Sequence, residues 1–79
     1  MKKIKSRTFI NSYTNEHLVT VTLYKLEIGY AILSEIGYKL NGETRLSEYE
    51  AVEYFDEVIK GTIKAFHSME QPFHTTETI

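Results

Sequence analysis

The fold is decided by residues 47–66, which read SEYEAVEYFDEVIKGTIKAF. Apolar side chains recur in this stretch at spacings of three and four, the period that places them on one face of an α-helix. The stripe consists of Val52, Phe55, Ile59, Ile63 and Phe66, widened by Ala51, Val58, Thr62 and Ala65. Ser47 and Glu50 have the spacing of a capping box, in which each side chain bonds the backbone N–H of the other residue. We therefore expect one long amphipathic helix that begins after Ser47, with Gly61 as its weakest position.

Two segments near the start of the chain have the composition of β-strands. Residues 18–25 (LVTVTLYK) alternate apolar and Thr side chains, the period of two that is typical of a half-buried strand. Residues 4–13 are rich in β-branched and aromatic types, and residues 14–17 have the composition of a turn. We expect a strand, a turn and a second strand.

Residues 26–40 fit both a helical stripe and one face of a strand. A helix interior loses about 1 kcal/mol for each Gly relative to Ala, and this stretch contains two glycines. Asn41-Gly42 follows directly and is a strong signal for a hairpin turn. The pattern therefore favours a strand over 30–40, a turn at Asn41-Gly42 and a short partner strand over 43–46.

These elements predict one small domain of the α+β class. We expect an antiparallel three- to four-stranded meander sheet, packed by one long C-terminal amphipathic helix, within residues 1–68. Residues 69–79 contain Pro72 and have no apolar period, so we expect a loosely ordered C-terminal tail. The alternative fold is β-β-α-β-α, with residues 26–40 helical.

The composition argues against several classes of function. Because the chain has no cysteine, it has no disulfide, no Cys-based zinc site and no thiol nucleophile. It has no apolar run of the roughly 18 residues of a membrane span and no signal-peptide pattern, so we expect a cytoplasmic protein. His17, His67 and His74 lack the spacing of metal ligands, and no nucleophile-elbow or phosphate-loop motif occurs. We expect a protein that is not an enzyme and uses no metal or cofactor.

Charge is segregated along the chain, although the net charge is only -2. The first seven residues contain four basic side chains, whereas residues 43–57 contain six carboxylates and one Arg. Within the predicted helix, Glu50, Glu53 and Glu57 recur at spacings of three and four opposite the apolar stripe, with Asp56 beside them. Like charges at this spacing cost a helix a few tenths of a kcal/mol. This acidic stripe is therefore either a solvated face of the helix or a binding surface for a basic partner.

We expect a non-enzymatic protein-binding module. Its partner would be a host protein or protein complex with a basic surface, bound through Glu50, Glu53, Asp56 and Glu57. One alternative is a small nucleic-acid-binding domain that uses the basic N-terminal strand, although the acidic net charge opposes it. The other alternative is a self-assembling structural or regulatory domain, since six tyrosines and exposed strand edges favour a homodimer.

The run from Tyr30 to Phe66, with a strand, a hairpin, a short strand and an acidic amphipathic helix capped by Ser47, resembles the build of several small phage anti-CRISPR proteins. The resemblance covers about half of the chain, concerns architecture and includes no diagnostic motif. It implies an inhibitor of a nucleic-acid-binding host defence complex, with Glu50, Glu53, Asp56 and Glu57 in the place of DNA phosphates. The Lys-rich start of the chain departs from a uniformly acidic mimic of DNA.

Overall fold

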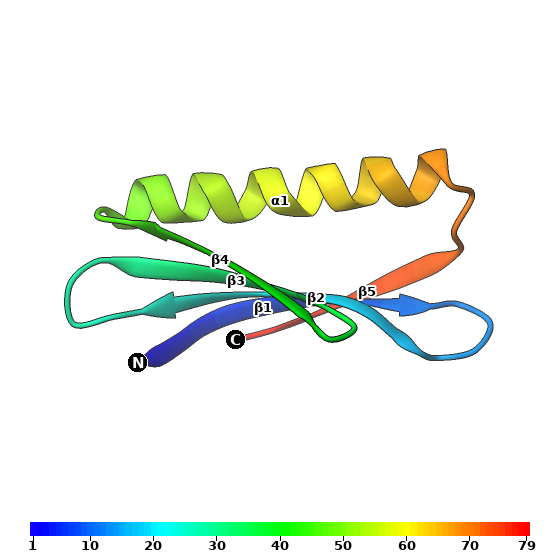
Figure 1. Ribbon diagram of the computed structural model, residues 1–79, viewed down its shortest axis with the longest axis horizontal. Coiled ribbons are helices and arrows are strands. Elements are labelled where there is room, and N and C mark those ends of the chain that lie inside the picture. The colour runs from blue at the N-terminus through cyan, green and yellow to red at the C-terminus, as the bar shows by residue number, and fades with distance from the viewer.

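The computed structural model describes all 79 residues and shows one antiparallel sheet with a single helix on one face (Figure 1). The elements are β1 Lys2–Asn11, β2 His17–Lys25, β3 Tyr30–Ile36, β4 Lys39–Arg45, α1 Glu48–Ser68 and β5 Phe73–Thr78. The strands lie in the order β4-β3-β2-β1-β5. The α+β class and the meander of β1 to β4 are confirmed, but the sheet has five strands rather than three or four. The β-β-α-β-α alternative is wrong, because β3 occupies the middle of residues 26–40.

Helix α1 begins at the predicted cap. The Ser47 hydroxyl accepts a hydrogen bond from the Glu50 backbone N–H at 3.2 Å. The same hydroxyl donates to Glu50 Oε1 at 2.8 Å, so the Glu50 carboxylate bonds the Ser47 side chain rather than its backbone. The helix runs through Gly61 without a break and ends at Ser68. It is not both long and apolar enough to cross a membrane.

The core lies between α1 and the middle of the sheet. Its nine buried residues are Phe9, Val19, Val21, Leu23, Ile32, Ala51, Phe55, Ile59 and Phe66. The helix contributes the centre of the predicted stripe, while Val52 and Ile63 are only half-buried and Ala65 is exposed. The stripe is therefore narrower than predicted, because one helix lying on a sheet buries only the side chains directly beneath its axis.

The hairpin between β3 and β4 turns at Gly37-Tyr38, so the predicted turn at Asn41-Gly42 is wrong. Ile36 pairs with Lys39, and Gly37 has a φ of +60°, which suits the first position of a two-residue hairpin turn. A turn at Asn41-Gly42 would leave only residues 43–46 for the partner strand before the helix cap. The observed turn allows seven cross-strand pairs, from Tyr30–Arg45 to Ile36–Lys39.

The prediction of a loosely ordered tail over residues 69–79 is also wrong. Glu70 adopts a φ of +55° after the helix, and β5 then returns antiparallel to β1 in a ladder of six residue pairs. Phe73 anchors the strand: its ring centroid lies 5.6 Å from that of Phe9 and 5.5 Å from that of Phe66. An edge strand with one apolar anchor and otherwise polar residues has no apolar period, so its sequence resembles a tail.

The sheet face opposite α1 is uncovered (Figure 1). The strand register places several Ser and Thr side chains on this face. Pairing partners in an antiparallel ladder share a face, so the pair Thr8–Thr20 lies opposite the core pair Phe9–Val19. The Thr8 and Thr20 hydroxyl oxygens are 3.3 Å apart, and those of Ser6 and Thr78 are 2.7 Å apart. These two pairs of hydroxyl groups bond each other across neighbouring strands, and Leu33 and Ala31 lie on the same face.

We expect Phe55→Ala to lower the free energy of unfolding by about 3 to 5 kcal/mol, because the ring is fully buried at the centre of the core. Urea unfolding of the variant and the parent measures this difference. Tyr49→Ala is the matched control, since it removes an exposed ring from the same helix and should change stability by less than about 1 kcal/mol. Equal losses in the two variants would contradict the packing of α1.

Phe73→Ala tests the docking of β5. The ring is half-buried, so we expect a loss of about 2 kcal/mol, with faster amide hydrogen exchange along β5 than in the parent. His74→Ala, whose side chain lies on the other face of the same strand, should change neither quantity. If the β5 amides of the parent exchange as fast as those of an unfolded peptide, β5 is not docked and residues 69–79 form a loosely ordered tail.

Candidate functional site

The four predicted acidic residues lie on the exposed side of α1, but they do not have one common role. The Glu50 carboxylate takes part in the helix cap, where it accepts a hydrogen bond from the Ser47 hydroxyl. Glu53, Asp56 and Glu57 are exposed and form no ion pair. Asp56 and Lys60 have the i, i+4 spacing of a helical ion pair but do not form one: the two ion pairs of the molecule are Arg7–Glu77 and Arg45–Glu43. The free acidic stripe is therefore Glu53, Asp56 and Glu57.

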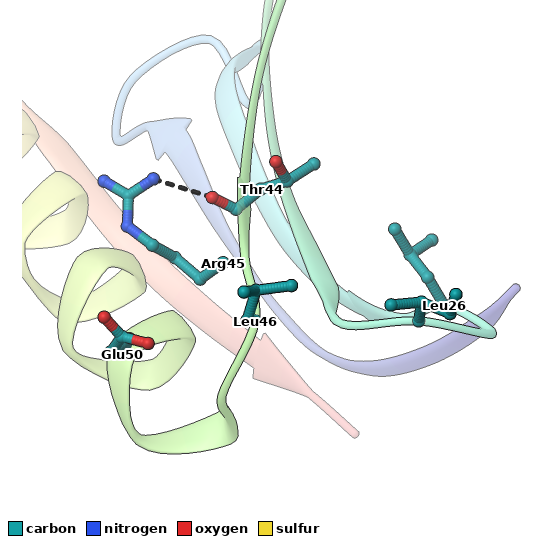
Figure 2. A pocket seen from close by; sticks show the side chains of 6 residues that line it. Leu26, Thr44, Arg45, Leu46 and Glu50 are labelled. Atoms are coloured by element: carbon teal, nitrogen blue, oxygen red, sulfur yellow. Dashed lines mark hydrogen bonds between the residues drawn. The ribbon is translucent and has the colours of Figure 1, made fainter.

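Exposed apolar side chains gather beside the first turn of α1. The β2–β3 connection carries Ile28, which is 82% exposed, and the β4–α1 connection carries Leu46, which is 81% exposed. The two connections border one shallow hollow, lined by Leu26, Ile28, Thr44, Arg45, Leu46 and Glu50. Figure 2 shows Leu26 and Leu46 on the two connections, with Glu50 projecting from the helix near Arg45.

Gly29 allows the two connections to approach each other closely. It has a φ of +81°, and the β2–β3 connection is closed by a hydrogen bond from the Leu26 backbone N–H to the Gly29 carbonyl oxygen at 3.0 Å. A Cβ atom at Gly29 would lie 2.7 Å from the carbonyl oxygen of Arg45 and 3.5 Å from the Cα of Leu46. This close approach of two backbones is possible only for glycine and fixes where Leu46 leaves the sheet.

Arg45 joins the end of β4 to the helix. Its guanidinium donates to Glu43 Oε2 at 2.9 Å and to the Thr44 carbonyl oxygen at 2.8 Å, and it lies 4.5 Å from the centroid of the Tyr54 ring. The hydrogen bond to Glu43 raises the pKa of Arg45 above its ordinary value, so the group stays protonated. Arg45 is the one basic side chain of residues 43–57. Because these contacts occupy its guanidinium, Arg45 does not neutralise the acidic stripe of Glu53, Asp56 and Glu57.

A second shallow hollow lies on another side of the same helical turns. It is lined by Tyr49, Val52, Glu53 and Asp56, and Tyr49 is 77% exposed. Successive residues of a helix are rotated by about 100°, so Tyr49 and Glu50 belong to different sides of α1, and Glu53 and Glu57 lie on the outer surface between them. We call the two hollows and the stripe between them the acidic–apolar surface; it comprises Leu26, Ile28, Leu46, Tyr49, Glu50, Glu53, Asp56 and Glu57.

The apolar half of this surface was missed by the sequence analysis. Leu46 directly precedes the N-cap, a position at which an apolar residue often packs against the helix, and here it is exposed instead. Ile28 stands between Glu27 and Gly29, in a four-residue connection that also contains Leu26. Large apolar residues in so short a connection are the signal that could have identified this part of the surface.

No protein-family model matches the chain, and neither the curated proteins nor the solved structures contain a significant match. Within the chain, no group of three or more His, Cys, Asp or Glu side chains comes together as metal ligands would. The site must therefore be interpreted from its own geometry.

Gly29→Ala should destabilise the protein by more than about 2 kcal/mol, because it combines left-handed backbone strain with a clash against the Arg45 carbonyl. Gly37→Ala is the matched control: it also has a positive φ, but nothing lies within 4 Å of the added Cβ, so we expect a loss of about 1 kcal/mol. Thermal melts of both variants measure the difference. Equal melting temperatures would show that the two connections do not touch.

Proposed function

We propose that this chain is a non-enzymatic protein-binding module that acts through the acidic–apolar surface. The observation that carries this proposal is that two large exposed apolar side chains, Ile28 and Leu46, border one hollow beside α1, while exposed Tyr49 lies in a second hollow across from them. The carboxylates of Glu53 and Glu57 lie between the two hollows and form no ion pair within the chain. Contiguous exposed apolar groups with a polar rim are typical of protein-interaction sites. The partner surface that fits carries apolar side chains surrounded by Lys or Arg.

The two parts of the surface have different physical roles. Burial of Ile28, Leu46 and Tyr49 against a partner removes apolar area from water and supplies affinity. The carboxylates of Glu53 and Glu57 attract a basic partner over a Debye length, about 8 to 10 Å at moderate salt, and so raise the association rate. The mutual repulsion of these carboxylates in the free protein decreases when basic groups approach them.

The resemblance to small phage anti-CRISPR proteins supports one specific form of the proposal. In that form the partner is a nucleic-acid-binding host defence complex in the cytoplasm, and Glu53, Asp56 and Glu57 occupy its phosphate-binding groups. Glu50 contributes charge at the edge of the surface while it caps the helix. The apolar residues then add contacts that DNA phosphates do not make.

Capture of a partner from nuclease-treated host lysate tests this proposal when the parent is compared with two variants of the surface. Ile28→Ser with Leu46→Ser removes apolar anchors, and we expect the affinity for the captured protein to fall at least about tenfold. Glu53→Lys with Glu57→Lys reverses the charge at two positions of the acidic stripe. We expect this variant to associate more slowly than the parent, with an association rate that no longer decreases when salt is added. Both variants should remain folded, because all four side chains are exposed.

Thr76→Lys is the matched control, because it places a charge on the uncovered face of the sheet. It should bind the captured protein as the parent does. If both surface variants bind like the parent and Thr76→Lys does not, the uncovered sheet face is the binding surface. A captured partner that proves to be a second copy of this chain, with twice the mass in sedimentation, would favour the self-assembling alternative.

A further inference from the structure

Three lysines converge on a hollow that has no part in the acidic–apolar surface. It lies where β1 begins and β2 ends, and its volume is about 550 Å³. Its lining consists of Lys2, Lys3, Ile4, Lys25, Tyr30, Glu48 and Ile79. Small-molecule sites in proteins commonly have volumes of about 300 to 1,000 Å³.

The strand register forces like charges together in this hollow. Lys2 and Lys25 are directly opposite each other in the β1–β2 ladder, an arrangement that disfavours the folded state unless an anion is present. Successive side chains of a regular strand point to opposite faces, yet Lys2, Lys3 and Ile4 all line the same hollow. A register shift between Lys3 and Lys5 accounts for this, because a bulge redirects the side chains around it.

No carboxylate of the chain forms an ion pair with these lysines, since the two ion pairs involve Arg7 and Arg45. Glu48 is the one acidic side chain in the lining, against three ammonium groups. Lys25 is held in place, because its Nζ atom lies 4.6 Å from the centroid of the Tyr30 ring. Ile4 packs against the core and gives the hollow an apolar wall. The hollow is therefore a positively charged site with an apolar side.

We propose that this hollow binds a nucleotide, with Lys2, Lys3 and Lys25 contacting the phosphate and the walls formed by Ile4 and Tyr30 contacting the base or sugar. Lysine ammonium groups bind phosphate as point charges, and an apolar wall accommodates the remainder of such a ligand. The nucleotide is either free or part of a single-stranded nucleic acid, because both present the same phosphate and ring chemistry. A bound phosphate removes the repulsion between Lys2 and Lys25, so it also stabilises the fold.

The test is an NMR titration of the isotope-labelled full chain with ADP and, separately, with an oligodeoxythymidylate of eight nucleotides. We expect saturable shifts of the amides of residues 2–4, 25 and 30, and a higher melting temperature with ligand. Lys2→Gln with Lys25→Gln should weaken binding at least tenfold. Without ligand, that variant should melt at or above the temperature of the parent, because the opposed charges are gone.

Lys60→Gln with Lys64→Gln is the matched control, since it makes the same change of net charge on the exposed side of α1. It should bind as the parent does. Tighter binding of the oligonucleotide than of ADP identifies a nucleic-acid strand as the source, whereas equal binding identifies the free nucleotide. The proposal is overturned if neither probe gives saturable shifts at millimolar concentration, or if the control variant loses as much affinity as Lys2→Gln with Lys25→Gln.

Discussion

The packing of α1 across the middle of the sheet is the interaction on which the rest of the structure depends. Phe55 is almost completely buried, and it packs in one cluster with Leu23 of β2 and Ile32 of β3. One helix is the only layer that this chain provides, so only one face of the five-stranded sheet is covered (Figure 1). The opposite face carries two pairs of hydroxyl groups that bond each other, Ser6–Thr78 and Thr8–Thr20, so the domain consists of two layers.

The position of the helix also decides which side chains remain available to a partner. Ser47 fixes the residue at which α1 begins, and Gly29 fixes how closely the β4–α1 connection approaches the β2–β3 connection. These two constraints place Ile28 and Leu46 next to the carboxylates of the first helical turns. The same end of the sheet brings Lys2 and Lys25 together through the β1–β2 register. Charges of opposite sign are thus concentrated in two separate places, and neither concentration is relieved by ion pairs within the chain.

The separation of these charged regions gives the proposals their physical basis. A carboxylate stripe and a lysine-lined hollow each cost the free protein some electrostatic stability, and each is relieved by a ligand of opposite charge. The acidic–apolar surface suits a protein partner because apolar anchors accompany its charge. The lysine hollow suits a small or local anion because its charge is gathered around a cavity of limited volume.

The sequence by itself determined the helix, its cap, the class of the fold and the meander of the first four strands. Each follows from local rules: the spacing of Phe55, Ile59 and Phe66, the hydroxyl of Ser47, and the alternation over 18–25. It also located the carboxylates, because residues of a helix three and four positions apart share a side whatever lies around them. Only the tertiary structure decided the turn at Gly37, the pairing of β5 with β1, and the exposure of Leu46. Those features depend on contacts between residues that are not neighbours in the chain. The turn at Gly37 depends on the ladder that β3 and β4 form before the helix begins, and the pairing of β5 depends on the packing of Phe73 against Phe9 and Phe66. The exposure of Leu46 depends on the close approach of the Gly29 backbone to Arg45.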